Sequence, residues 1–229
     1  MDRTHTPHDL NTPPPTAPGG FLVSLDGPSG VGKTTTTQQL HDLLAAAGHR
    51  TVLETQPSSS PIGALARHST HTIHGLALTC LMAADRYHHL TTTLLPHLAA
   101  GRVVVCDRYT PTAFVLDQLD GAETEFIASL YRYARPADLF VFLTASPRVC
   151  VDRARSRGSN YSRFHHTDTR SAEREQALFA ETAQRYQRAG LPVLELSTQA
   201  LATQEVAAHI AERVRAELVA RHAGRGRVA

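Results

Sequence analysis

The segment from residue 27 to residue 34 carries the clearest chemical signal in the sequence. It reads GPSGVGKT and fits the pattern GxxxxGK[ST]. Glycines at this spacing let backbone N–H groups gather around phosphate oxygens, and the N-terminus of a following helix adds partial positive charge. A lysine there can reach the β- and γ-phosphates of a nucleotide, and a threonine hydroxyl can ligate Mg²⁺. We therefore predict a phosphate site formed by Gly27, Ser29, Gly30, Val31, Gly32, Lys33, Thr34 and Thr35.

Lys33 is the only lysine in the chain. The other 22 of the 23 basic residues are arginine, a usage that suggests exchange of lysine for arginine wherever it is tolerated. The lysine that remains is then one that arginine cannot replace. The same count disfavours a P-loop GTPase, because a guanine-reading NKxD motif would need a second lysine.

Two Asp–Arg pairs and a group of arginines are further candidates. Asp107 and Arg108 follow a buried apolar run, at the strand end where open α/β sheets bind ligands. Asp85 and Arg86 lie in the middle of a helical pattern. Several arginines cluster around Gly158, at positions 153, 155, 157 and 163. Simpler interpretations remain open: a solvated helix pair, a helix cap and solvated surface arginines.

The elements that must position these residues alternate along the chain. Short apolar runs predict strands at 21–25, 50–54, 103–106, 139–143 and 192–196. Helical patterns cover 33–47, 73–99 with a bend at Pro96, 111–119, 123–134 and a segment starting near 147. In the last helix, apolar residues recur every fourth position from Val206 to Leu218. This alternation predicts an α/β fold with a parallel sheet covered on both faces.

Composition excludes several classes of protein. The 229 residues are 41% hydrophobic and 19% charged, with a net charge of +2, which is typical of a globular chain without a nucleic-acid footprint. Three distant cysteines form neither a disulfide framework nor a zinc pattern, which favours a reducing cytoplasm. The spaced histidines come without further ligands, which disfavours a metal site there. We find neither a membrane span nor a signal peptide.

We expect three regions along the chain. Residues 1–20 hold five of the 13 prolines and predict a disordered tail. Residues 21–222 form one domain, and residues 223–229 form a flexible C-terminal tail.

Taken in order, these motifs resemble the thymidylate kinase family of nucleoside monophosphate kinases. The P-loop, the end of a REPGGTPIG segment at Pro61–Gly63, an ADR helix, a DRY strand end and an arginine-rich LID occur at about the family's spacings, over residues 21–215. Phe179–Tyr186 resembles the helix after the LID. The resemblance implies a P-loop three-layer α/β/α sandwich with a five-stranded parallel sheet and a LID at about 153–172. It also implies a homodimer without nucleic-acid or membrane partners.

By this resemblance, the reaction moves the γ-phosphoryl group of ATP, with Mg²⁺, to a small-molecule nucleotide. Thr34 and Asp107 would hold the metal. The catalytic residues would be Lys33, Asp107, Arg108, Arg153, Arg157 and Arg163. The P-loop contains no arginine, so the transition-state arginine would come from the LID.

The sequence departs from the family on the acceptor side. The REP arginine and glutamate are Thr55 and Gln56, and Ser29 replaces an acidic P-loop residue. The aromatic residue that stacks on thymine is Met82, and two polar positions are Ala113 and Leu116. The acceptor residues implied are Gln56, Pro57, Met82, Arg86, Arg108, Thr112 and Leu116. We expect a pyrimidine or modified nucleotide as acceptor. The alternatives are a nucleoside, a specialised-metabolite phosphate, or a nucleotide-binding module without turnover.

Overall fold

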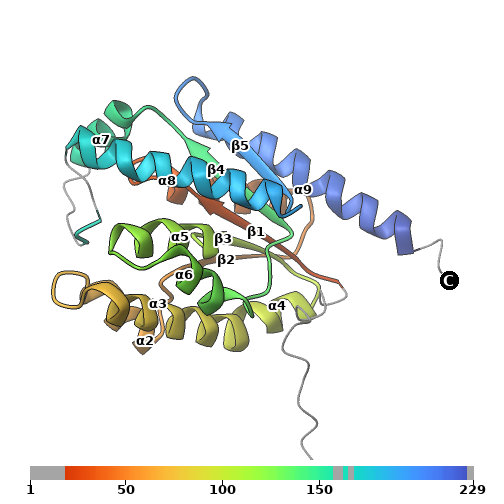
Figure 1. Cartoon of the computed structure of the whole chain (residues 1–229). Helices are drawn as coiled ribbons and strands as arrows, with labels where there is room; N and C mark the ends of the chain where they lie inside the picture. Colours follow the sequence, from red (N-terminus) through yellow and green to blue (C-terminus); the bar gives the residue numbers. More distant parts are fainter. Residues whose placement is uncertain (1–18, 157–161, 165–167, 226–229) are drawn as a thin grey trace, which may run out of the picture.

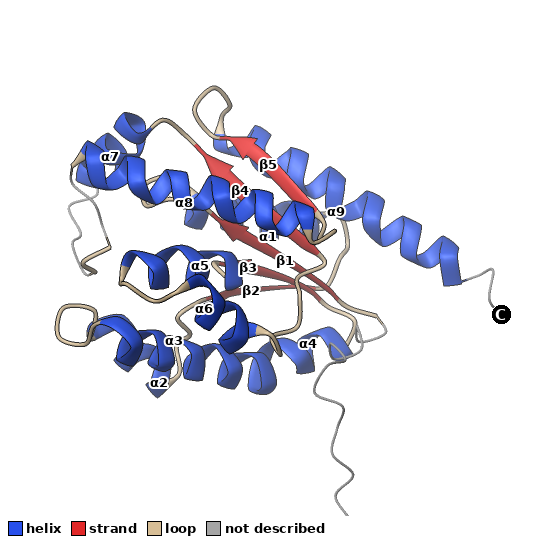
Figure 2. Cartoon of the chain, in the orientation of Figure 1, coloured by secondary structure: helices blue, strands red, loops and turns tan. Residues whose placement is uncertain are grey.

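The computed structural model describes residues 19–156, 162–164 and 168–225. Five strands occur where the apolar runs predict them: β1 (Phe21–Asp26), β2 (Thr51–Thr55), β3 (Val103–Asp107), β4 (Leu139–Thr144) and β5 (Val193–Ser197). They form one parallel sheet in the order β2-β3-β1-β4-β5 (Figure 2). The predicted five-stranded parallel sheet is confirmed.

Helices cover both faces of this sheet (Figure 1). One face packs against α3 (Gly75–His89), α5 (Thr110–Leu119), α6 (Thr124–Tyr131) and α8 (Thr169–Arg188). The other face packs against α1 (Lys33–Ala46), α7 (Pro147–Ser156) and α9 (Thr203–Arg225). The side chains of β1 alternate between the two cores, with Leu22 on the first side and Phe21, Val23 and Leu25 on the second. This is the three-layer α/β/α sandwich that the sequence predicts.

The register of the central strands assembles the site. Leu25 of β1 lies opposite Asp107 of β3, and Thr55 of β2 lies opposite the same residue. Parallel strands place their carboxyl ends at one edge of the sheet. The turn after β1, residues 27–32, therefore lies beside the end of β3, which is where Arg108 follows.

The long helix predicted over residues 73–99 is divided into three pieces. A π-helical turn, η1 (Leu90–Leu94), lies between α3 and α4 (Leu95–Ala99). The N–H of Leu95 donates to the carbonyl of Leu90, five residues earlier. Pro96 has no N–H and its ring clashes with the preceding turn, so the helix widens just before it. One further helix, α2 (Pro61–His68), was not predicted; Ser60 caps it by accepting the N–H of Gly63.

Two observations bear on the classes excluded by composition. Among the described residues, no helix is both long enough and apolar enough to cross a membrane. Cys80, Cys106 and Cys150 are free thiols, and the last two are buried.

Candidate active site

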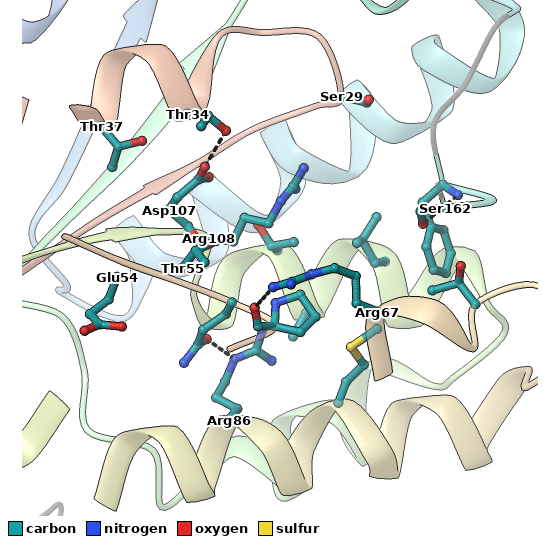
Figure 3. A pocket seen from close by; sticks show the side chains of 18 of the residues that line it. Ser29, Thr34, Thr37, Glu54, Thr55, Arg67, Arg86, Asp107, Arg108 and Ser162 are labelled. Carbon is teal, nitrogen blue, oxygen red and sulfur yellow. Dashed lines mark hydrogen bonds between the residues drawn. The ribbon is translucent and has the colours of Figure 1, made fainter. Parts of the chain in front are cut away.

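A cavity of about 950 Å³ opens at the carboxyl edge of the sheet (Figure 3). Ser29, Thr34 and Thr35 lie at its P-loop end. Met82, Arg86, Leu116 and Asp117 line it from α3 and α5, along with Asp107 and Arg108. The volume is at the upper end of the range for small-molecule sites. A single cavity therefore joins the predicted phosphate loop to the predicted acceptor residues.

The glycines of the loop have a physical reason. Gly27 and Gly30 adopt φ of 149° and 83°, which side-chain-bearing residues rarely do. A Cβ on Gly27 would lie 2.4 Å from the carbonyl oxygen of Leu143, and one on Gly30 would lie 2.1 Å from that of Cys150. The loop, which also contains Val31 and Gly32, therefore packs directly on β4 and α7 and leaves its other side to the cavity.

Lys33 begins α1 and is 5% exposed. Its Nζ donates to the carbonyl oxygens of Gly27 and Pro28, each at 2.8 Å. Burial, with the nearby Arg108 guanidinium, lowers the pKa of Lys33 to about 7, although Asp107 and Glu175 oppose the shift. The ammonium group is thus held on loop carbonyls, in a site that weakens its charge.

Thr34 and Asp107 lie side by side (Figure 3). The Thr34 hydroxyl donates to Oδ2 of Asp107 at 2.6 Å. The other carboxylate oxygen, Oδ1, is buried and has no hydrogen-bond partner among the described residues. A hydroxyl and a carboxylate are hard oxygen ligands of the kind that Mg²⁺ takes, with water and phosphate completing its shell. The donor set fits a bound Mg²⁺. Histidine, cysteine, aspartate and glutamate side chains form no metal-binding group of three within the described ranges.

Arg108 has φ of 73°, the one described non-glycine residue with a positive φ. Its N–H donates to the carbonyl oxygen of Leu25 at 3.0 Å. This backbone geometry is costly for a side-chain-bearing residue and occurs most often at functional sites. It directs the side chain into the cavity, where Figure 3 shows it between the P-loop and Arg86.

A chain of buried polar side chains holds Arg86. Its Nε donates to Oε1 of Gln56 at 2.6 Å. The amide nitrogen of Gln56 lies 3.3 Å from Nδ1 of His89, and Nε2 of His89 lies 3.0 Å from Glu54. Because the amide can only donate, Nδ1 accepts and Nε2 donates to the Glu54 carboxylate, which assigns the tautomer. β2 and α3 thereby fix the arginine.

The remaining acceptor residues also line the cavity. Pro57, Met82, Thr112 and Leu116 all border it. The Thr112 hydroxyl donates to Oδ1 of Asp26 at 2.6 Å, and burial raises the pKa of that carboxyl. Thr112 is thus tied to the end of β1.

The LID arginines occupy different places. Arg153 donates to the hydroxyl and carbonyl oxygens of Thr198 at 3.1 and 3.0 Å, and Thr198 in turn donates to the carbonyl of Val31 in the P-loop. Arg163 pairs with Asp120 at 2.5 Å and lies over the ring of Phe164, which borders the cavity. Arg157 lies outside the described residues.

Three residues at the site escaped sequence reasoning. Glu175 of α8 is 2% exposed, and its carboxylate accepts the N–H of Ser29 in the P-loop at 3.1 and 3.2 Å. Asp117 of α5 borders the acceptor end. Arg67 of α2 donates to the carbonyl of Pro57 (Figure 3). A signal existed only for Asp117, which lies one helical turn after the diverged position 113.

This fold and this site define a P-loop kinase of the nucleoside monophosphate class. The family model for thymidylate kinase matches residues 25–209. A thymidylate kinase of Xanthomonas oryzae pv. oryzae is 33% identical over 165 residues, covering 71% of this chain and 72% of the relative; one of Xanthomonas campestris pv. campestris gives the same values. A probable thymidylate kinase of Staphylothermus marinus is 28% identical over 150 residues, covering 65% and 75%. The chain belongs to the thymidylate kinase family.

Proposed function

We propose that the protein transfers the γ-phosphoryl group of ATP, with Mg²⁺, to a (deoxy)nucleoside monophosphate whose base is a pyrimidine or a modified pyrimidine. The observation that carries this proposal is the single cavity that joins Ser29, Thr34 and Asp107 to Arg86. One cavity with a phosphate loop at one end and a buried guanidinium at the other suits two substrates bound end to end.

The donor side would work through positioning and charge. Lys33 would leave the carbonyls of Gly27 and Pro28 and bind phosphate oxygens in its charged form. Thr34 and Asp107 would hold Mg²⁺, which supplies charge neutralisation at the phosphates. Arg108 reaches into the space between the two ends and would stabilise the transferred group.

The LID would contribute a second positive charge. Arg163 stacks on Phe164 at the edge of the cavity, so a small movement would bring its guanidinium to the phosphates. The contacts of Arg153 with Thr198 support a positioning role that links the LID to the P-loop. Arg157 remains a catalytic candidate by family resemblance.

The acceptor side supports a substrate other than dTMP. Met82 offers an apolar surface but no flat ring for stacking, and Leu116 has no hydroxyl for a sugar. Ala113 cannot hydrogen-bond a base. Thr55 cannot give a phosphate a bidentate charged contact, because its hydroxyl donates to the carbonyl of Asp107 at 3.3 Å.

By the same family resemblance we propose a homodimer in the cytoplasm. The exposed leucines Leu65 of α2 and Leu76 of α3 offer apolar surface for a second copy. Sedimentation at micromolar concentration should give twice the 24.9 kDa mass of one chain. A monomer would contradict the dimer, and recovery in a non-cytoplasmic cell fraction would contradict the location.

The experiment for the proposed function is a panel of nucleoside monophosphates with Mg·ATP, read as ADP formed. We expect turnover with at least one acceptor, loss of turnover with EDTA, and little ADP without acceptor. Nucleosides in a parallel panel test the main alternative. ATP binding without ADP from any acceptor would overturn the proposal and leave a binding module.

A further inference from the structure

Arg86 presents an unused donor at the acceptor end of the cavity. The side chain is 5% exposed and lies 5.0 Å from the centre of the Tyr131 ring. Its Nε is bound to Gln56, but its Nη1 is buried without a hydrogen-bond partner among the described residues. A buried guanidinium nitrogen without an acceptor is costly, and a cavity wall is where a ligand can satisfy it.

Asp117 presents an acceptor at the same end. It lies on α5, is 5% exposed and borders the cavity. The Tyr131 hydroxyl donates to its Oδ2 at 3.4 Å, which is long for such a bond. A carboxylate has about four acceptor positions, so this contact leaves capacity for a ligand.

The position of Asp117 on its helix explains why it faces the acceptor. Ala113 and Asp117 are four residues apart on α5, so both lie on one face, about 6 Å apart along the axis. By the family resemblance, position 113 holds a side chain that hydrogen-bonds the base. Here that side chain is a methyl group, and the nearest polar group on the same face is one turn further along.

The charges of the site point the same way. Gln56, the partner of Arg86, is neutral, so it does not balance the buried guanidinium charge. Asp117 is the acidic side chain of α5 that borders the cavity with Arg86. A ligand that accepts from Arg86 and donates to Asp117 would bridge the two charges and satisfy both.

We propose that Arg86 and Asp117 together recognise a lactam edge of the acceptor base, Arg86 donating to its carbonyl oxygen and Asp117 accepting its ring N–H. This edge is shared by uracil-type pyrimidines and guanine. Cytosine and adenine lack a ring N–H beside a carbonyl in their neutral forms. The inference rests on the proposed function and names Asp117 as a residue that determines its substrate class.

The site also gives recognition a pH dependence. Burial raises the pKa of Asp117 to about 7, although the Arg86 guanidinium and the Tyr131 hydroxyl oppose the shift, and Asp120 adds to it. Thr79 of α3 and Tyr131 of α6 also face this carboxyl. Only the ionised carboxylate accepts freely from a base N–H. The KM for a lactam acceptor should therefore fall as the pH rises through about 7.

The experiment compares wild type with Asp117→Asn at saturating Mg·ATP. Lactam acceptors (dUMP, dTMP, GMP) are set against amidine acceptors (dCMP, AMP), and N3-methyl-dUMP is a blocked analogue. We expect Asp117→Asn to raise KM for lactam acceptors by about 10–10²-fold with kcat within about threefold, since a partner of a bound N–H is lost. Wild type should discriminate against the blocked analogue by a similar factor, and the variant should not.

Two controls separate recognition from folding. Glu125→Gln makes the same carboxylate-to-amide change at an exposed position in the first turn of α6 and should leave every KM unchanged. The change in KM near pH 7 should disappear in Asp117→Asn, whereas titration of the acceptor phosphate near pH 6 affects both proteins equally.

The outcomes are distinct. Unchanged lactam-to-amidine ratios and an unchanged pH profile in a folded Asp117→Asn variant would overturn the inference alone. If the variant fails to fold, the blocked analogue and the pH profile of wild type decide, and equal KM values for dUMP and N3-methyl-dUMP would overturn it. If wild type phosphorylates none of the acceptors, the proposed function itself is wrong.

Discussion

At the scale of single residues, the site is defined by side chains held away from their reactive positions. Lys33 donates to the carbonyls of its own loop, and Thr34 donates to Asp107. Both contacts occupy groups that phosphate or Mg²⁺ would take. Ligand binding at this site therefore exchanges protein hydrogen bonds for ligand contacts, so the affinity of the nucleotide depends on how weakly those internal bonds are held.

Replacement of Lys33 by alanine should remove most of the activity. The loss of a positioned phosphate contact typically lowers the rate by about 10²–10³-fold. The side chain is buried on two loop carbonyls, so the loop as well as the chemistry loses a contact. Steady-state kcat with Mg·ATP measures the effect, and circular dichroism checks the fold. A folded variant with full activity would sink the P-loop kinase mechanism.

Nucleotide affinity should fall as the pH rises above about 7. Burial lowers the pKa of the empty-site Lys33 to about 7, and bound phosphates favour its charged form. Between pH 7 and the higher pKa of the complex, binding must take up a proton, so each pH unit weakens it by at most about tenfold. Calorimetry of ADP binding in two buffers of different ionisation enthalpy measures the uptake. Lys33→Ala should take up no proton, and a pH-independent affinity in wild type would contradict the mechanism.

Sequence reasoning reached the residues whose motifs are local. The P-loop, Asp107 and Arg108 are neighbours along the chain or at a strand end, so spacing alone predicts them. Glu175 and Asp117 reach the cavity through the packing of α8 and α5 on the sheet, and a sequence without that geometry does not predict it. The direction of the Lys33 side chain was also beyond reach, since we expected it to meet solvent or ligand.

At the scale of elements, the connections between helices and the P-loop are the least local feature. α7 reaches the loop through Arg153 and Thr198, and α8 reaches it through the carboxylate of Glu175. These two helices flank the LID. A change in the LID is therefore transmitted to the phosphate loop by two polar contacts, one on each side.

The LID arginines should respond unequally to replacement by alanine. Arg153→Ala removes charge-assisted bonds that anchor α7, and we expect a loss of about 1–2 kcal/mol of stability. Arg163→Ala should lower kcat and leave the melting temperature nearly unchanged, because its ion pair with Asp120 is partly exposed. Thermal melts and kcat measure both, and Arg148→Ala, exposed in the first turn of α7, is the matched control. Equal effects of all three variants would refute this assignment.

Periodicity predicted the strands and most helices correctly but missed two details of helix geometry. Pro96 indicated a bend in the segment 73–99, and the structure widens that helix into the π-turn Leu90–Leu94 instead. α2 was missed because its eight residues are too few for a periodic signal, although Ser60 and Pro61 form a normal helix start.

At the scale of the whole molecule, the order of the strands brings the donor and acceptor ends into one cavity. β3 lies between β1 and β2, so the P-loop, Asp107 and Gln56 follow three adjacent strands. The number and direction of the strands followed from the sequence pattern. Their order did not, because it depends on how the crossover helices pack.

We expect dTMP to rank below another acceptor in a panel with dUMP, dCMP, CMP, UMP and GMP. Two lost polar contacts at roughly 1–1.5 kcal/mol each weaken it by about 10–10²-fold. They are the base contact at Ala113 and the sugar contact at Leu116. The measurement is kcat/KM for each acceptor at the same Mg·ATP concentration. A value for dTMP at the top of the panel, at about 10⁴ M⁻¹s⁻¹ or more, would show that the pocket compensates for these losses.

The burial of the only lysine has a practical consequence for labelling. The chain carries a single side-chain amine, and it lies inside the phosphate loop. With a pKa of about 7, roughly half of the molecules hold it as a nucleophilic free amine at neutral pH. An acylating reagent can therefore modify only two amines, this one and the α-amine of the chain. Mass spectrometry of the two products would read out occupancy of the loop directly, and a nucleotide added first would direct the label to the chain terminus.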